Sequence, residues 1–573
     1  MEREEGTEAR RHEGTKGEEG TEARRGTHNP QSSIVNRQSS IPNPQSSIRN
    51  SQSAIPNSSL RLAYAGITLA FLAITLYACS GPRGSDQFWY LGETITLMAG
   101  EPPLSNTIFP GPLLRGEFVV EKNYFNHHTL VSYLVLPFAT WLGAYRGWIA
   151  FNIVSVLTAG ALIAVGLRRL ATHWVALIGY GVFLLLPVTI WQTANMLQEA
   201  AFCMITALLS VLYVFGERSQ LRWIVLFAVS AAAVLCHPLY LPLAAILPVL
   251  FLWRQRSALT TGHFVLAGMA LGVVVFLQTM KSGWFPSIFQ PSFTAMVLSA
   301  IPGRGNMEWH YRVELPALTP GLMISKVVDA LKCQLALRPA AVFFWPTNVM
   351  LLGSVLLIRR RGEHPKTARL VSATVAFIAL FALLVCLHQN QFRFSLIITP
   401  AILMSTAVYT HRAFTSARGR QGAAGLLATV LLGFAAIDVA LARHLRRDGT
   451  QAAMTIESIR RQTEGLGDDQ RIVIEASSSS EPLMLAYALR PRQCLILKRG
   501  YLSPQMVQRL LASFAPRVLF CRPNSDLPEQ AGAIRLEADW PGQYREFKAY
   551  EIRQAGTHGA GLGSVGLNDP KRG

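Results

Sequence analysis

The residues best suited to chemistry lie in "GSDQFWYLGE", residues 84–93, directly after an apolar run long enough to cross a bilayer. Asp86 and Glu93 are carboxylates, which act as general bases when a proton to be removed lies within hydrogen-bond reach. Three aromatic side chains, at 88–90, stand between them. Ionisable groups at membrane depth are costly and usually mark a functional path or cavity. The two carboxylates are therefore the first candidates for a site.

The composition indicates a membrane protein. Half of the 573 residues are apolar and 15% are charged, whereas soluble proteins carry about a quarter charged residues. The net charge of +19 could suggest nucleic acid, but residues 1–60 hold eight Lys/Arg and eight Glu and add nothing to it. The excess lies in short loops between apolar runs, where the positive-inside bias places it. We therefore expect a lipid bilayer as partner and no nucleic acid.

Apolar runs of roughly 20 residues predict about eleven transmembrane helices and a mainly α, polytopic fold. The run at 130–143 is too short to cross comfortably and contains Pro137, so it predicts an interfacial or re-entrant helix. The predicted spans are about 61–79, 147–167, 174–191, 200–216, 222–237, 239–254, 264–282, 340–358, 369–388, 393–410 and 422–442.

Loop charges orient these spans. With the N-terminus inside, the five inner loops together hold 14 Lys/Arg against two acids, whereas the first outer loop, 80–129, holds three against five. Positive charge in short loops marks the cytoplasmic side. The sequence therefore predicts an integral inner or plasma membrane protein with a cytoplasmic N-terminus and an extracytoplasmic C-terminus.

In this orientation the remaining polar residues near span ends gather on the outer side. Taken singly, each could be an interfacial side chain whose tip reaches water, and for the lone His237 we favour that interpretation. As a set they favour a polar cavity. Besides Asp86 and Glu93, the set comprises His127, His128, Gln192, Asn195, Gln198, Glu199, His388, Gln389, Asn390 and Arg393.

The rest of the chain divides by composition. The heptad-like repeats of the N-terminal tail carry one reliable Ile and recurring Pro, so they predict disorder. Beyond 447 the runs "RIVIEA", "CLIL" and "RVLFC" predict strands of a small extracytoplasmic α/β domain. Its Cys494 and Cys521 lie where a disulfide can persist, and their pairing stays open. The predicted regions are a tail (1–60), a transmembrane domain (61–446, with outer loops 80–129 and 283–339), an α/β domain (447–555) and a disordered tail (556–573).

Together these elements resemble the polytopic glycosyltransferases of the GT-C fold, among them the bacterial aminoarabinose transferases and the protein O-mannosyltransferases. The resemblance covers roughly 61–442. It rests on Asp86 just after the first span, on "YFNHHTLVSYLVLPFATWLG" (124–143) and on "NQFRFSLIITPAIL" (390–403). The sequence departs from the pattern where Gln87, instead of a second acid, follows Asp86, and where Gln198 and Glu199 stand near an expected Asp.

The resemblance implies transfer of a sugar from a polyprenyl-phosphate carrier to a lipid, glycan or protein acceptor, on the extracytoplasmic face and with inversion. Asp86 matches the catalytic acid and would be the general base; its structural alternative is a helix N-cap. Arg393 matches the late-span Arg, which would hold the donor phosphate; its alternative is a snorkelling anchor. The substrate-binding candidates are Glu93, His127, His128, Gln198, Glu199, Gln389 and Arg393.

No cofactor is certain from the sequence. Five residues could hold a divalent cation, since His and carboxylate groups are competent ligands, but their spacing is not diagnostic and we favour sugar contacts. They are Glu121, His127, His128, Glu199 and His237. The competing functions are a lipid or glycan transporter or flippase, which would show internal repeats, and a membrane scaffold, which leaves the outer polar set unexplained.

Overall fold

The structure is a computed structural model, and its described residues all belong to one unit of the chain, Asn57–Gly573. The N-terminal tail up to residue 56, residues 237–318 and the last 21 residues lie outside them. The described residues are 57–101, 106–114, 129–215, 220–236, a few positions between 319 and 328, 341–359, 365–387, 395–413, 417–475, 480–498, 502–522, 524–530, 533–536 and 548–552.

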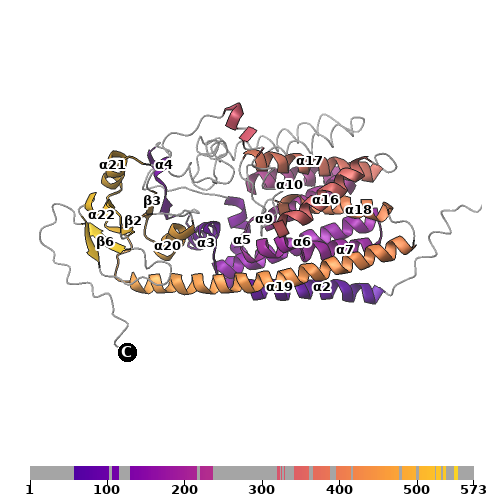
Figure 1. Cartoon of the computed structure of the whole chain (residues 1–573), viewed down its shortest axis with the longest axis horizontal. Helices are drawn as coiled ribbons and strands as arrows, with labels where there is room; N and C mark the ends of the chain where they lie inside the picture. The colour runs from indigo at the N-terminus through magenta and orange to yellow at the C-terminus, as the bar shows by residue number, and fades with distance from the viewer. Residues whose placement is uncertain are drawn as a thin grey trace, which may run out of the picture. The chain divides into compact units, whose positions relative to one another are not determined.

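Helices occupy the predicted spans wherever the structure describes them (Figure 1). Two of them, at Ser58–Ala78 and Ala144–Leu170, are long and apolar enough to cross a membrane by themselves within the described part of the chain. The predicted spans at 239–254 and 264–282 lie outside the described residues. The helices are α2 (Asn57–Ala78), α6 (Ala144–Leu170), α9 (Glu199–Phe215), α10 (Gln220–Cys236), α16 (Ala341–Arg359), α17 (Pro365–Leu387), α18 (Ser395–Ala413) and α19 (Ala417–Gln462).

The span predicted at 174–191 is a broken helix. It consists of α7 (His173–Leu184) and α8 (Pro187–Ala194), which are bent by 50°. Pro187 stands at the start of α8, where its missing N–H costs nothing and its ring prevents continuation of the helix before it. The short run predicted at 130–143 is α5 (Thr129–Leu142). Its 14 residues extend about 21 Å, less than the hydrocarbon core of a bilayer.

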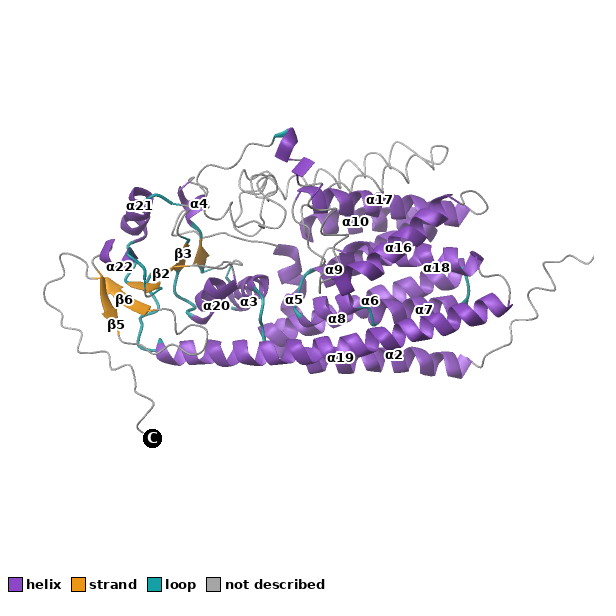
Figure 2. Ribbon diagram, in the orientation of Figure 1, coloured by secondary structure: helices purple, strands orange, loops and turns teal. Residues whose placement is uncertain are grey.

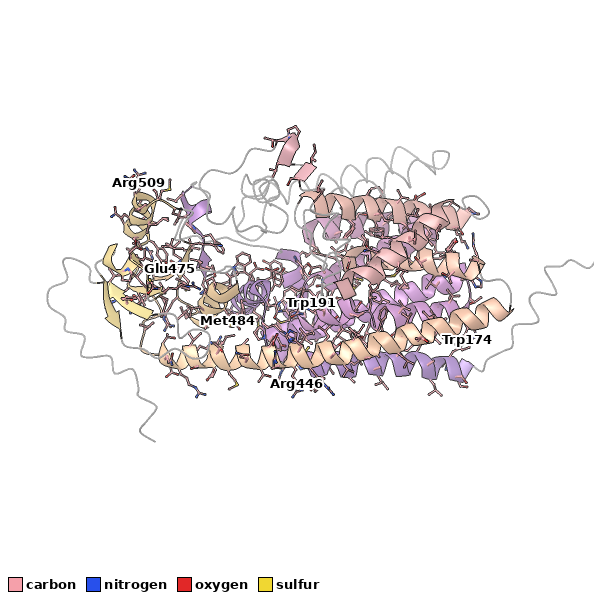
Figure 3. The ribbon with its side chains drawn as sticks, viewed as in Figure 1. Trp174, Trp191, Arg446, Glu475, Met484 and Arg509 are labelled. Atoms are coloured by element: carbon pink, nitrogen blue, oxygen red, sulfur yellow. The ribbon has the colours of Figure 1, made fainter. Side chains whose placement is uncertain are left out.

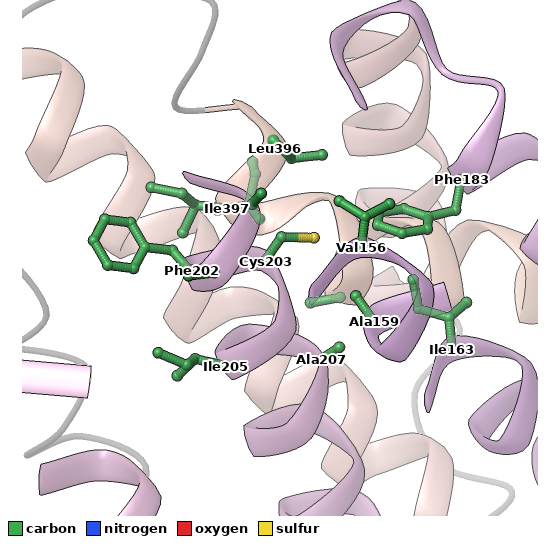
Figure 4. Packing of buried hydrophobic residues seen from close by; sticks show 14 of the residues in the cluster. Val156, Ala159, Ile163, Phe183, Phe202, Cys203, Ile205, Ala207, Leu396 and Ile397 are labelled. Atoms are coloured by element: carbon green, nitrogen blue, oxygen red, sulfur yellow. The ribbon is translucent and has the colours of Figure 1, made fainter. Parts of the chain in front are cut away.

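The helices share one apolar core in which α6 is central. It packs against α5, α7 and α9, and α18 packs against α9 and α16. Figure 4 shows Val156 of α6 near Phe183 of α7, and Cys203 of α9 near Ile397 of α18, in this core. Close approach depends on small residues, because a Cβ at Gly147 of α6 would lie 2.5 Å from the Ala139 backbone of α5.

The first and last helices of this set, α2 and α19, lie side by side and run in the same direction. Ile67 and Leu431 both lie against Gly181, and further along Gly81 lies against Gly449. A parallel pair of first and last spans requires an odd number of crossings, as the predicted topology has.

A six-stranded sheet, five strands of which come from the C-terminal region, has the order β1-β3-β2-β4-β6-β5 (Figure 2). Pairing is parallel from β1 to β4 and antiparallel from β4 to β5. The strands are β1 (Thr107–Ile108), β2 (Ile472–Glu475), β3 (Cys494–Leu497), β4 (Val518–Cys521), β5 (Ala533–Leu536) and β6 (Lys548–Ile552), with helices α20 (Ser480–Ala488) and α21 (Pro504–Phe514) between them.

The sheet includes a strand that the sequence analysis does not predict. β1 comes from the first outer loop and pairs in parallel with β3, where Cys494 N donates to Asn106 O at 2.7 Å. The first outer loop therefore contributes to the α/β domain. Cys494 and Cys521 are buried, are not joined by a disulfide, and lie on strands separated by β2; burial raises the pKa of Cys494 to about 12.

Candidate functional site

Helix α3 (Ser85–Met98) carries both carboxylates of the first outer loop. Its N-cap is Gly84, so Asp86 is not the cap; it lies half-buried in the first turn, where the helix dipole favours a negative charge. Asp86 and Glu93 are seven residues, or about two turns, apart and therefore share one side of the helix. The elements around α3 decide where that side faces.

The start of α3 is fixed by a buried amide pair. Gln87 Nε2 donates to Asn195 Oδ1 at 2.9 Å, and Gln87 Oε1 accepts from the Arg83 backbone N–H at 2.9 Å. The Arg83 guanidinium donates to the carbonyls of Ala78 and Ala194, at the ends of α2 and α8. Gln87 therefore fixes the start of α3 directly beside Asp86.

The three aromatic residues between the carboxylates contact three different parts of the chain. Phe88 lies 5.5 Å from the Tyr487 ring of the α/β domain. Trp89 lies 5.7 Å from Phe109, next to β1. Tyr90 stacks on Trp148 of α6 at 5.3 Å. The aromatic run is thus explained by packing, because it holds α3 against the α/β domain, the first outer loop and the transmembrane helices at once.

Trp148 also binds α3 through its indole nitrogen. Its Nε1 donates to Thr94 Oγ1 at 2.8 Å, and the Thr94 hydroxyl donates to Tyr90 O at 2.7 Å. All three side chains are buried. A fully satisfied buried network of this kind fixes a single arrangement, so the middle of α3 has little freedom to rotate.

The far end of α3 is held by an arginine of the α/β domain. Arg490 Nη1 donates to Gly92 O at 2.6 Å, and its Nε donates to Asn106 Oδ1 at 3.2 Å. Burial lowers the pKa of the guanidinium to about 10 and the charge of Glu93 acts against this, so it stays protonated at neutral pH. Glu93 is 1% exposed and accepts from Ser132 Oγ at 3.1 Å. Glu93 is therefore a buried carboxylate that faces a cation.

The turn between α8 and α9 supplies further polar groups. Gln198 and Glu199 are both buried there, and Asn152 Nδ2 of α6 holds the turn by donating to Leu197 O at 3.1 Å. Met196 has a φ of 52°, a strained conformation for a residue with a side chain. Because Asn195 of this turn binds Gln87, the structure brings the turn and the start of α3 together.

The structure thus places four of the eight predicted site residues: Asp86, Glu93, Gln198 and Glu199. The other four, His127, His128, Gln389 and Arg393, lie outside the described residues, as do Glu121 and His237. Within the described ranges no group of three His, Cys, Asp or Glu side chains could hold a metal ion. Of the five candidate metal ligands predicted from the sequence, only Glu199 lies in these ranges. The metal hypothesis concerns residues that are not described.

Sequence reasoning missed several residues that position α3, among them Asn106, Ser132, Trp148 and Arg490. Trp148 reads as an ordinary residue of an apolar span, and Arg490 as part of a polar turn, "LRPRQ". Their contacts with α3 join residues up to 398 positions apart in the chain. No local sequence pattern predicts contacts between residues so far apart.

No protein family model matches the chain, and no curated protein matches it in sequence. Solved structures do match. The crystal structure of ArnT from Cupriavidus metallidurans bound to undecaprenyl phosphate is 11% identical, with a TM-score of 0.54 over 87% of this chain and 99% of that one. The same enzyme in the apo state gives 12% identity and a TM-score of 0.55 over 87% and 98%.

A further match is the oligosaccharyltransferase of Archaeoglobus fulgidus in complex with zinc and sulfate. It is 10% identical, with a TM-score of 0.48 over 86% of this chain and 73% of that one. ArnT, an aminoarabinose transferase, and the archaeal oligosaccharyltransferase are GT-C glycosyltransferases. The likeness to ArnT extends over nearly the whole of that enzyme. The chain therefore has the GT-C fold of membrane glycosyltransferases.

Proposed function

We propose that the protein is a membrane glycosyltransferase that moves a sugar from a polyprenyl-phosphate carrier to an acceptor hydroxyl on the extracytoplasmic face. The observation that carries the proposal is helix α3. It holds a half-buried Asp86 on a GT-C fold, fixed by buried contacts to α6, α8 and the α/β domain. ArnT, which shares the fold, was crystallised with undecaprenyl phosphate, and a carrier of that class fits the many apolar helices of this chain.

In the proposed reaction Asp86 is the general base. Its carboxylate takes the proton of the acceptor hydroxyl as that oxygen attacks the anomeric carbon. The bond from this carbon to the phosphate oxygen breaks, and the polyprenyl phosphate leaves with the electron pair. One displacement inverts the anomeric centre. Arg393 would pair with the phosphate, because a guanidinium binds its oxygens bidentately as negative charge develops there.

The surroundings of α3 suit this role for Asp86. The neighbouring position is Gln87, whose amide is engaged with Asn195 and the Arg83 backbone, so it adds no like charge. Holding a catalytic group within a fraction of an ångström is worth orders of magnitude in rate, and the clamps on α3 provide that restraint.

Glu93 is better suited to substrate binding or to support than to proton transfer. It is almost fully buried, accepts from Ser132 and lies by the Arg490 cation. Gln198 and Glu199, on the turn that reaches Gln87 through Asn195, would contact sugar hydroxyls.

The test is to compare Asp86→Asn, Arg393→Ala and Arg393→Lys in purified protein, measuring turnover and lipid-donor affinity. Asp86→Asn should lower turnover by about 10²-fold or more while donor binding survives. Arg393→Ala should weaken donor binding, and Arg393→Lys should restore it only in part, because an ammonium lacks the planar fork. Glu101→Gln, an exposed acid of the same loop, is the control and should behave as wild type. Normal turnover of Asp86→Asn would mean that the base lies elsewhere.

A transporter or flippase is the second candidate, since the broken pair α7 and α8 resembles the discontinuous helices of transporters. The same variants separate the two functions. A flippase should move a fluorescent polyprenyl-phosphate sugar across liposomes equally well with Asp86 or Asn at this position and without an acceptor. A transferase should form glycosylated product only with the carboxylate.

A further inference from the structure

Three arginines stand where the charge bias of the chain does not place them. Helix α19 leaves its apolar stretch at residue 442 and then carries Arg443, Arg446 and Arg447 within five residues. Ser80 Oγ donates to Arg446 O at 2.6 Å, so these arginines lie at the same end of α19 as the first outer loop. Basic residues normally gather at the opposite, cytoplasmic ends of spans. Their presence at this end calls for a negatively charged partner.

The arginines line an open hollow of about 710 Å³ on α2 and α19, together with Tyr77, Gln451 and Met454. The Arg446 guanidinium lies over the Tyr77 ring, 4.7 Å from its centroid, and donates to Tyr77 O at 3.5 Å. Figure 3 labels Arg446 on the α19 helix. We call this hollow the arginine hollow.

Acidic side chains of the described residues offset the positive charge of the arginine hollow only in part. Among the described residues, Asp448 is paired with an arginine of the hollow: its carboxylate lies 3.7 Å from Arg447 Nε and 3.2 Å from His444 Nε2. One carboxylate against three guanidinium groups leaves an excess of positive charge. Exposed pairs of this kind contribute little, so Arg447 remains available to a stronger anionic partner.

Two exposed apolar lines lead into the arginine hollow. On α2, Leu62, Leu69 and Leu76 are exposed at intervals of seven residues, and Leu76 adjoins Tyr77. On α19, Leu432 and Val439 are exposed at the same interval, and seven residues further comes Arg446. Residues seven apart lie on one side of a helix, and α2 and α19 run in parallel. The surface is therefore apolar along two adjoining helices and basic at their common end.

We propose that the arginine hollow binds the phosphate of one anionic phospholipid, from the leaflet on the α3 side, whose acyl chains lie along α2 and α19. Guanidinium groups pair with phosphate oxygens bidentately, and a tyrosine at this depth suits the headgroup region. Basic pockets beside transmembrane helices bind lipid headgroups in this way. The binding site is separate from α3 and does not depend on the proposed transferase activity.

The test is lipid retention in the purified full-length protein, measured by native mass spectrometry after titration with phosphatidylglycerol or phosphatidylcholine. Wild type should retain one phosphatidylglycerol in preference to phosphatidylcholine. Replacing Arg443, Arg446 and Arg447 by Gln should weaken this binding by about 10²-fold, and Arg447→Gln alone by about fivefold, at roughly 1 kcal/mol per arginine.

The matched control replaces Arg460, Arg461 and Arg509, three exposed arginines outside the hollow, by Gln. It removes the same charge and should leave phosphatidylglycerol retention unchanged. Equal retention of both lipids by wild type, an equal loss in the control, or no loss in Arg447→Gln and the triple variant would overturn the proposal. Soluble glycerol 3-phosphate should compete only weakly; competition at equal concentration would refute the role of the apolar lines.

Discussion

Replacing Arg490 by Gln should slow the proposed reaction although Arg490 belongs to the α/β domain. Its guanidinium is bound to Gly92 O of α3 and to Asn106 Oδ1 of the first outer loop. Glutamine is too short to reach both acceptors and carries no charge to face Glu93. The far end of α3 would therefore lose its fixation, and with it the exact placement of Asp86.

The magnitude follows from the contacts that are lost. A hydrogen bond from a charged group contributes about 1.5–3 kcal/mol, so two contribute about 3–6 kcal/mol before the desolvation of the guanidinium is deducted. A buried charge regains only part of its desolvation cost through its contacts. We therefore expect Arg490→Gln to lower the free energy of unfolding by about 2 kcal/mol. A displacement near 1 Å of a catalytic group costs about 10²-fold in rate. Turnover should therefore fall by about 10-fold to 100-fold, with donor affinity little changed.

Arg492→Gln is the matched control for this experiment. Arg492 is a buried arginine of the same α/β domain, and its guanidinium donates to Gly467 O at 3.1 Å and to Leu466 O at 2.5 Å. Because neither partner is on α3, this variant should lose stability and keep its turnover at temperatures where it is folded. The measurements are thermal unfolding and steady-state kinetics of both variants. Equal turnover in Arg490→Gln and Arg492→Gln would refute the claim that Arg490 positions α3.

Two further predictions concern the chain as a whole. Reporter fusions after residue 447 should report an extracytoplasmic position and fusions within 359–369 a cytoplasmic one, because the inner loops carry the Lys/Arg excess; the opposite result at either site would move the proposed site to the wrong face. Deleting residues 1–58 should leave membrane insertion and turnover intact, since this segment is repetitive and near neutral, and a large loss of either would assign it a function.

The helices and central strands were predictable because their signals are local. Long apolar runs predict α2 and α6 within a few residues, and short apolar runs predict β2, β3 and β4. The break at Pro187 was predictable in principle, since proline ends the preceding helix, but the apolar composition on both sides favoured one continuous span. Local sequence patterns thus predict the positions of helices and strands more reliably than the breaks and connections between them.

The pairing of distant segments was not predictable. β1 has two residues, too few to show an alternation, and it is recognised only through its partner β3, almost 390 positions away. The same holds for the contact between Arg490 and Gly92. In the candidate site, Asp86 and Glu93 follow from residue type and position, whereas the residues that orient them belong to other elements and show no pattern of their own.

Helix α3 belongs to two cores, and this has a consequence for the α/β domain. Phe88 packs with Ile456, Met484 and other residues of the α/β core, whereas Tyr90 packs in the core of the transmembrane helices. Two residues of one short helix cannot move independently with two separate bodies. The contacts of the α/β domain with α3 therefore help to fix the position of Asp86. A change that displaces the domain should lower turnover before it affects membrane insertion.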